Sequence, residues 1–206
     1  MVKGVLIDWG GVLTTSMSEA VAGWIAADRL DGDHYRAVMR ELLLQESVVH
    51  ALERGEISAA DFERDLAARL RTIDGTSPVA EGLLSRMFLG FQRVDAMYDM
   101  LLRVRGAGIK TCLLSNSWAN EYPRDGWDEV FDAVVISGEI GMRKPEPRIF
   151  EHALDLIGLR GPECVFIDDF EINIVAAREL GIGVIHHTTP DTTIAELETL
   201  LRLPLR

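Results

Sequence analysis

Residues 3–13 read KGVLIDWGGVL, and this stretch decides how the rest of the 206-residue chain is interpreted. The run from Val5 to Ile7 is apolar, and Asp8 followed by Trp-Gly-Gly ends it. So short a run, bounded by glycine, is typical of a strand that is buried on both faces. A carboxylate directly after such a strand either begins a turn or stands where open α/β sheets bind their ligands. The remaining sequence has to distinguish these two interpretations.

The composition is that of a folded protein with a marked acidic excess. Hydrophobic residues make up 48% of the chain and charged residues 26%, which allows a sizeable apolar core. The formal net charge is −12, from 21 Lys and Arg against 33 Asp and Glu. This acidity argues against nucleic acid and anionic membranes as partners, because both attract basic surfaces. A small anionic substrate remains compatible, because a local group of donors can outweigh the overall field.

Three features of the sequence predict a cytoplasmic protein that does not enter a membrane. No run approaches the ~20 apolar residues that span a bilayer. The amino terminus enters the first predicted strand without the pattern of a signal peptide. Cys112 and Cys164 each lie in an apolar, strand-like run, so we expect buried thiols rather than a disulfide framework or a metal site.

The pattern of the chain changes near residue 93. Residues 16–92, here called the helical insertion, read almost entirely as helices with apolar stripes. From residue 94 onward, short apolar runs alternate with helical patterns, which predicts a parallel sheet wound with helices. The first strand precedes the helical block, so the block is interpreted as an insertion. The further expected strands are residues 109–114, 131–136, 164–167 and 183–185, and the expected helices are residues 94–104, 147–157, 173–180 and 193–201.

Polar side chains follow several of these predicted strands. Because parallel strands end at the same edge of a sheet, we expect these side chains to share one cleft. They are Asp8 after the first strand, Ser115-Asn116 after the second, Lys144 in the loop after the third, and Asp168-Asp169 after the fourth.

This combination of residues predicts a phosphate and metal site. Asp8 and the pair Asp168-Asp169 would repel one another unless a cation neutralised them, and a hard ion such as Mg²⁺ prefers carboxylate oxygens. The hydroxyl group of Ser115, nearby backbone N–H groups and Lys144 suit phosphate oxygens. Asp8 is then placed to act as a nucleophile, because aspartyl-phosphate chemistry uses a carboxylate in this way.

The motifs DWGGVL, LLSN, RKPEP and FIDDFEIN, in this order, resemble the four motifs of the haloacid dehalogenase superfamily. The resemblance covers essentially the whole chain. The segments GEIGMRKPEPRIF and FIDDFEINI are most similar to the branch with bacterial glucose-1-phosphate phosphatase-like proteins and the amino-terminal phosphatase domain of soluble epoxide hydrolases. The resemblance implies a Rossmann-like α/β core, residues 1–15 and 93–206. It also implies that residues 16–92 form an all-helical cap of the C1 type.

The resemblance also implies a set of metal ligands. Asp8 would attack phosphorus and bind Mg²⁺, and Gly10 would offer its backbone carbonyl to the same ion. Asp169 would complete the site, with Asp168 helping directly or through water. Asn173 stands where many members carry a further acid, and we expect it to support the metal site through hydrogen bonds.

The remaining motif residues are implied to bind the substrate. Ser115 and the backbone of Asn116 would hold the phosphoryl group, and Lys144 would neutralise charge on it and on the nucleophile. Trp118 follows closely, and it either faces the substrate or packs in the core. His50, on a helical segment of the insertion, is expected at the surface.

Gly10 is the main departure from the family pattern. Most phosphatases of the superfamily carry a second aspartate at this position, which acts first as general acid and then as general base. Such acid–base help is worth ~10²–10⁴ in rate. Glycine therefore predicts slower turnover, a proton donor from the cap, or a leaving group that needs little protonation, such as an anomeric or acyl phosphate. The glucose-1-phosphate phosphatase-like branch also tends to carry glycine, so loss of all activity does not follow.

These inferences together predict a hydrolase, namely a Mg²⁺-dependent phosphatase of small phosphorylated metabolites, with sugar phosphates foremost. We expect a monomer or a homodimer. One alternative is a metal-independent 2-haloacid dehalogenase-type hydrolase, which the paired acids Asp168-Asp169 disfavour. The other is a catalytically weak phosphometabolite-binding protein, which the glycine at position 10 suggests.

Overall fold

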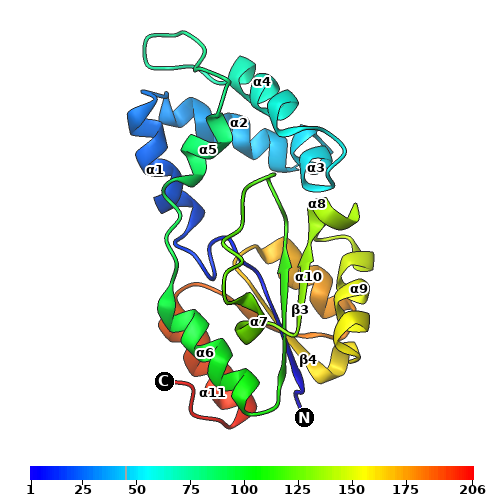
Figure 1. Cartoon of the computed structure of the whole chain (residues 1–206). Coiled ribbons are helices and arrows are strands. Elements are labelled where there is room, and N and C mark those ends of the chain that lie inside the picture. The colour runs from blue at the N-terminus through cyan, green and yellow to red at the C-terminus, as the bar shows by residue number, and fades with distance from the viewer. Residues whose placement is uncertain (45) are drawn as a thin grey trace.

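One parallel sheet of five strands forms the centre of the computed structural model, which describes residues 1–44 and 46–206 (Figure 1). All four strand pairings are parallel, in the order β3-β2-β1-β4-β5. The α/β fold expected from the sequence is therefore confirmed. The strands are β1 (Gly4–Ile7), β2 (Lys110–Ser115), β3 (Ala133–Ile136), β4 (Cys164–Asp168) and β5 (Gly183–His186).

The central strand β1 is buried on both faces, as its unbroken apolar run predicts. Successive side chains of a strand point to opposite faces of the sheet. Val5 and Ile7 accordingly pack in one hydrophobic cluster, with residues of α6 (Asp95–Gly106) and α11 (Pro190–Leu201). Leu6 packs in another, with α9 (Pro147–Ile157) and α10 (Glu171–Glu179). The sheet is thus covered by helices on both faces.

The helices predicted between the strands are present, with small shifts at their ends. The structure adds three short helical segments that the sequence pattern did not reveal, because each is too short for a helical period to show. These are α7 (Trp127–Val130), α8 (Ser137–Ile140) and the 3₁₀ helix η1 (Gly161–Glu163). Both cysteines are free and buried, as expected. Within the described residues, no helix combines the length and apolarity required to cross a membrane.

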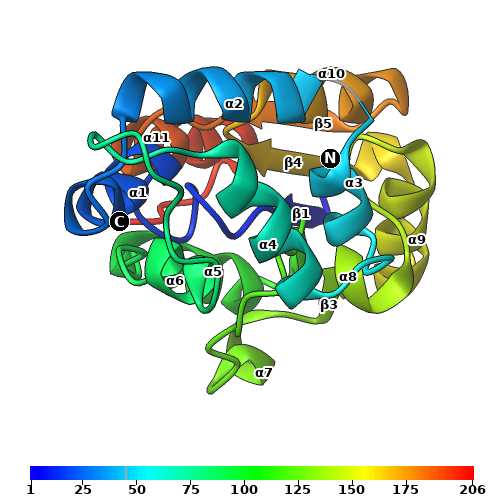
Figure 2. The ribbon, with the colours of Figure 1, turned by 90° about the horizontal axis from the view of Figure 1, so that it is seen from above.

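The helical insertion lies over the carboxyl ends of the strands (Figures 1 and 2). It has a hydrophobic cluster of its own, which Trp118 joins from the sheet-bearing part. The chain enters and leaves the insertion through paired segments, because Thr15 N donates to Gln92 O and Val94 N donates to Leu13 O. The division into two domains stays a prediction. The helices of the insertion are α1 (Met17–Ala27), α2 (Gly32–Leu44), α3 (Val48–Glu53), α4 (Ala59–Arg69) and α5 (Leu83–Phe88).

Gly90 is expected to be essential for the packing of the insertion. A Cβ atom at this position would lie 2.1 Å from the carbonyl oxygen of Ala20 in α1. We therefore expect Gly90→Ala to lower the free energy of unfolding by about 1–3 kcal/mol, because backbone atoms must move to make room. Gly106→Ala is the matched control, since nothing lies within 4 Å of its Cβ position. Urea unfolding of both variants measures the difference, and equal stabilities would contradict the packing.

Candidate active site

The buried ammonium group of Lys144 joins the ends of two neighbouring strands. Its Nζ lies 2.8 Å from Asp8 Oδ1 and 2.7 Å from Asp168 Oδ2. Asp8 directly follows β1 and Asp168 ends β4, and these strands pair side by side in the sheet. Lys144 is 1% exposed. The structure therefore brings together three residues that lie far apart in the sequence.

The charge of Lys144 is secured by these two carboxylates. Burial alone would lower the pKa of Lys144, but Asp168 and Asp8 outweigh burial and raise it above its usual value. The side chain is therefore a permanent cation at neutral pH. Backbone N–H of Trp9 also donates to Asp8 Oδ1, at 2.7 Å, so two donors fix the orientation of the Asp8 carboxylate.

Asn116 holds the backbone of the lysine loop in place. Its Oδ1 accepts a hydrogen bond from Lys144 N at 2.8 Å, and its Nδ2 donates to Lys144 O at 3.0 Å. This pair of bonds gives the Asn116 side chain a structural task that the sequence did not reveal. The predicted contact between the Asn116 backbone and a phosphoryl group stays a prediction.

Asp168 is surrounded by donors. Its Oδ1 accepts hydrogen bonds from Phe170 N at 2.7 Å and from Asn173 Nδ2 at 3.1 Å. Its Oδ2 accepts from Lys144 Nζ at 2.7 Å and from Asn173 Nδ2 at 3.1 Å. With both oxygens occupied, Asp168 is better suited to position Lys144 than to bind a metal directly. The hydrogen bonds expected from Asn173 are therefore made to Asp168.

The carboxylate of Asp169 lies in surroundings that are suitable for a metal ion. Oxygens of Asp8, Asp168 and Asp169 lie within 4.8 Å of one another. Asp169 Oδ1 is buried and has no hydrogen-bond partner among the described residues. A Cβ atom at Gly11 would lie 2.5 Å from Asp169 Oδ2, so a glycine is required beside this carboxylate. The all-oxygen donor set fits a hard divalent cation such as Mg²⁺.

The electrostatics of the carboxylates also favour a cation. Burial raises the pKa of Asp8 to about 8; Lys144 opposes the shift, whereas Asp168 and Asp169 add to it. Burial likewise raises the pKa of Asp169 to about 6, and Asp168 adds to that shift. Both carboxyl groups would ionise more readily beside a positive ion, so a bound metal would lower both pKa values.

Ser115 and Tyr122 form the neutral side of the site. Ser115 ends β2, is buried, and has its Oγ 3.0 Å from the hydroxyl oxygen of Tyr122. Burial raises the pKa of Tyr122 to about 12, so its hydroxyl group keeps its proton at neutral pH. Tyr122 packs edge-on against Trp9, with ring centroids 4.9 Å apart. Tyr122 was not among the site residues predicted from the sequence.

Gly10 has room for a larger residue. A Cβ atom there would meet only Phe91, at 4.0 Å, and Gly10 is not among the positive-φ glycines. The absence of the usual aspartate is therefore not imposed by space or by backbone conformation. Gly10 lines the same cleft as Asp8.

A cleft of about 610 Å³ lies above Asp8, lined by both the strand ends and the helical insertion. Trp118 lines it and also packs against Phe62 of α4, with ring centroids 5.7 Å apart, so it faces the cleft and the core at once. The expectation for His50 is wrong. It is buried and lines the cleft, with Nδ1 3.3 Å from Glu46 Oε2, because α3 turns this side chain inward.

Glu53, at the end of α3, connects the insertion to the lysine loop and was not among the residues predicted from the sequence. It is 4% exposed and accepts hydrogen bonds from Trp118 Nε1 at 2.9 Å and from Arg143 Nε at 2.5 Å. Arg143 directly precedes Lys144, so this ion pair links the insertion to the site. Nothing in the local sequence distinguishes Glu53 from a solvent-exposed helical glutamate.

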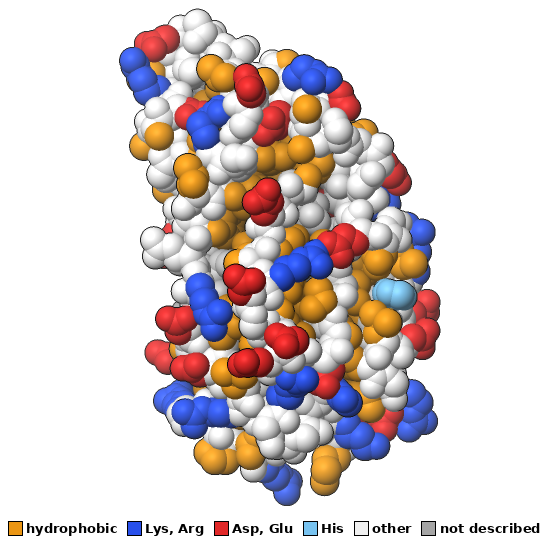
Figure 3. All heavy atoms as spheres, viewed as in Figure 1, with side chains coloured by type: hydrophobic (Ala, Val, Ile, Leu, Met, Phe, Trp, Pro, Cys, Tyr) orange, Lys and Arg blue, Asp and Glu red, His pale blue; other side chains and the backbone are white. Residues whose placement is uncertain are grey.

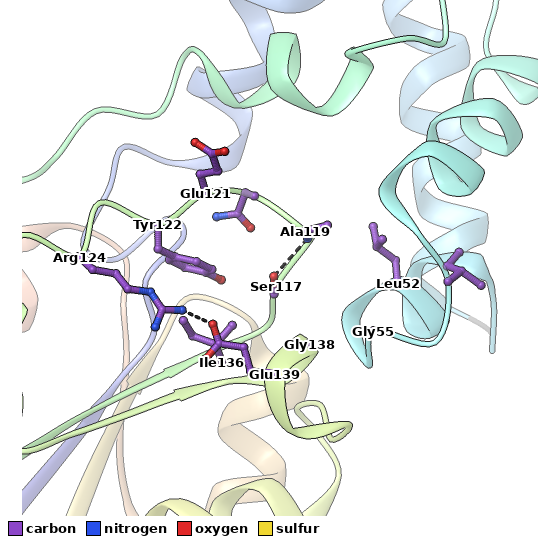
Figure 4. A pocket seen from close by; sticks show the side chains of 12 residues that line it. Leu52, Gly55, Ser117, Ala119, Glu121, Tyr122, Arg124, Ile136, Gly138 and Glu139 are labelled. Carbon is purple, nitrogen blue, oxygen red and sulfur yellow. Dashed lines mark hydrogen bonds and ion pairs between the residues drawn. The ribbon is translucent and has the colours of Figure 1, made fainter.

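A second pocket, of about 510 Å³, lies between the turn at Gly55 and the loop that follows β2 (Figure 4). Tyr122 contributes to both pockets. An ion pair between Arg124 and Glu139 crosses its wall (Figure 4). None of the three clustered aspartates lines this pocket, whereas Asp8 lines the larger cleft.

The family model of haloacid dehalogenase-like hydrolases matches residues 2–181. The chain belongs to this family of hydrolases. It is 28% identical to the sesquiterpene phosphatase astK of Aspergillus oryzae, over 96% of this chain and 92% of that protein. It is 29% identical to the D-ribitol-5-phosphate phosphatase of Bacteroides thetaiotaomicron, over 88% and 89% respectively.

Other similarities concern a part of a longer protein, or the fold alone. The chain is 29% identical to mouse acyl-CoA dehydrogenase family member 10, of which it covers 19%. A haloacid dehalogenase family enzyme from B. thetaiotaomicron, solved with magnesium and inorganic phosphate, superimposes with a TM-score of 0.67 at 24% identity, covering 91% of this chain and 95% of that one. A HAD-like hydrolase from Porphyromonas gingivalis gives 0.73 at 23% identity, covering 98% of both chains. These structures share the fold.

Binding of Mg²⁺ is expected to release protons near neutral pH. The raised pKa values of Asp8, about 8, and Asp169, about 6, mean that part of this pair is protonated at pH 7, whereas the metal binds the ionised form. The affinity for Mg²⁺ should therefore rise from pH 6 through pH 8 and level off about one pH unit above the pKa of Asp8. Calorimetric titration at pH 7 in buffers of different ionisation enthalpy measures the protons released.

The control for this titration is Asp169→Asn, which should abolish binding. An affinity for Mg²⁺ that does not change with pH, without proton release, would contradict the role assigned to these two carboxylates.

Proposed function

We propose that this hydrolase is a Mg²⁺-dependent phosphatase that cleaves small phosphate monoesters through an aspartyl-phosphate formed on Asp8. The observation that carries the proposal is the 2.8 Å ion pair between buried Lys144 and Asp8. Beside it stands Asp169 with an unpartnered buried oxygen, which suits a metal ion. A nucleophile, a fixed cation and a metal position thus meet at one end of a deep cleft.

In the first step, a carboxylate oxygen of Asp8 attacks phosphorus and the bond from phosphorus to the alcohol oxygen breaks. Lys144 favours the ionised form of Asp8, which burial opposes, and neutralises charge on the phosphoryl oxygens. Ser115 supplies a hydroxyl group for the same oxygens. Bound by Asp8, Asp169 and the backbone carbonyl of Gly10, Mg²⁺ would add further charge neutralisation.

In the second step, water attacks phosphorus and the bond between phosphorus and Asp8 breaks. Inorganic phosphate leaves, and the carboxylate is regenerated. The sum is one phosphate monoester plus one water giving one alcohol plus one phosphate. The insertion, which lies over the site, would exclude bulk water from the first step.

The alcohol needs a proton as it leaves, and Gly10 cannot provide one. Glu53 is already bound by Arg143, which makes it a poor donor. His50 of the insertion lines the cleft and is the candidate for this role. A proton donor from the cap is one of the three consequences expected from the glycine at position 10.

The relatives support a phosphatase without selecting a substrate. Their names cover a sesquiterpene phosphatase and a D-ribitol-5-phosphate phosphatase. These names leave the expectation of sugar phosphates, made from the sequence, untested. The dehalogenase alternative is disfavoured by the three clustered carboxylates, because a halide-releasing site needs no metal.

Replacing the nucleophile is expected to abolish turnover. Asp8→Asn should lower kcat toward p-nitrophenyl phosphate by about 10³-fold or more, because the amide cannot form the phosphorylated intermediate. Asp99→Asn, an exposed change on α6, is the matched control and should retain activity. Phosphate release that survives Asp8→Asn, or that persists in a chelator, would refute the proposal.

An acid at position 10 is expected to increase turnover. Gly10→Asp places a carboxyl group where space is open, and kcat toward an alkyl phosphate should rise about tenfold or more through protonation of the leaving group. Gly10→Asn has nearly the same shape and no acidic proton, so it should show no gain. If both variants behave alike, protonation of the leaving group does not limit the rate.

A further inference from the structure

We propose that the cleft selects phosphate monoesters of apolar alcohols, with a hydrocarbon group of about eight or more carbon atoms, over phosphates of polyhydroxylated alcohols. The inference rests on the proposed phosphatase function and adds the class of leaving group. It is carried by the chemistry of the cleft walls, which differs sharply from that of the floor around Asp8.

Two helices of the insertion present apolar stripes to the cleft. On α1 and on α2 the lining residues recur at every fourth position, so each helix directs one face toward the cavity. These residues are Met17, Val21 and Ile25 on α1, and Tyr35, Met39 and Leu43 on α2.

An aromatic wall begins directly beside the nucleophile. Trp9 follows Asp8 in the chain and lies parallel to Phe91, with ring centroids 6.0 Å apart. Phe91 in turn packs on Phe88 at 5.1 Å, and all three rings line the cleft. An alcohol that extends away from a phosphoryl group on Asp8 therefore meets aromatic rings.

Most polar groups of the described lining are already engaged with protein partners. Glu53 is bound by Trp118 and Arg143, and Glu46 pairs with Arg54 and His50. The hydroxyl groups of a polyol would lose their water without finding equivalent partners here, which is unfavourable.

Two polar lining residues of the insertion, Ser18 and Arg36, lie at exposed positions. Ser18 is 3.2 Å from the hydroxyl oxygen of Ser16, and Arg36 forms an ion pair with Asp33. Among the described residues, Asn120 Nδ2 is a buried amide donor at the cleft that lacks a partner. The indole Nε1 of Trp9, which also lines the cleft, is a second such donor. Two N–H groups can hold two ester or hydroxyl oxygens, which is less than a polyol requires.

The mouth of the cleft is also apolar. Phe170 and Ile172, which line it, are 43% and 61% exposed. Figure 3 shows hydrophobic side chains gathered between the helical part and the sheet-bearing part of the molecule. Large apolar side chains that remain exposed beside a cavity are typical of a binding surface. The cavity of about 610 Å³ lies in the range of sites that bind drug-sized molecules.

The test compares wild-type kinetics for ethyl, butyl, hexyl and octyl phosphate, all below their micelle concentrations, with glucose 6-phosphate and a pentitol phosphate. KM should fall about threefold to fourfold with each added methylene group until the cleft is filled. The kcat/KM value for octyl phosphate should exceed those of the polyol phosphates at least about a hundredfold. A KM that is independent of chain length, or a preference for the polyols, would overturn the inference.

A pair of variants locates the effect in this cleft. Ala22 is an exposed residue of α1 that lines the cavity, and Ala27 is an exposed residue of the same helix outside it. Ala22→Trp should reduce the ratio of kcat/KM for octyl over ethyl phosphate at least about tenfold, because the indole fills the space for the chain. Ala27→Trp should leave this ratio unchanged. Equal ratios in the two variants, with both folded by circular dichroism, would place the selectivity elsewhere and refute the proposal.

The two proposals fail in different ways. If p-nitrophenyl phosphate is hydrolysed in an Asp8-dependent manner but chain length has no effect, the inference about the leaving group is wrong and the phosphatase stands. If no ester releases phosphate, the proposed function itself is wrong.

Discussion

The burial of one ammonium group between two carboxylates is the constraint on which the site depends. An unpaired cation inside a protein is costly, so Lys144 can be buried only where Asp8 and Asp168 stand on both sides of it. The pairing of β1 with β4 brings those two carboxylates together, and Asn116 fixes the backbone of the lysine loop. The order of the strands therefore determines where two carboxylates can neutralise a buried lysine.

In that arrangement the adjacent residues Asp168 and Asp169 have different surroundings. Asp168 is occupied by donors from Lys144, Asn173 and the backbone, whereas Asp169 keeps a buried oxygen without a partner among the described residues. From the sequence alone both were assigned to the metal. Consecutive residues at a strand end point in different directions, and a one-dimensional pattern does not show which donors each side chain meets.

The helical insertion makes the walls of the cleft apolar. Its apolar stripes predict helices with one apolar face, and the structure shows that Val21, Tyr35 and Met39 belong to the core cluster and also line the cavity. A periodic pattern reports which face of a helix is apolar, whatever that face contacts. The floor of the cleft is highly charged and its walls are apolar, which suits a molecule with a phosphate at one end and a hydrocarbon at the other.

The sequence by itself determined the strands, the main helices, the parallel sheet and the four motif positions, because each of these has a local pattern. Glycine at position 10 was likewise visible from the start, but only the structure showed that space for an acid is open there. Tertiary structure alone decided that Glu53 and His50 turn inward, that Tyr122 meets Ser115, and that Asp169 rather than Asp168 has an unpartnered oxygen. The physical reason is that these features depend on contacts between segments far apart in the chain, for which no local pattern exists.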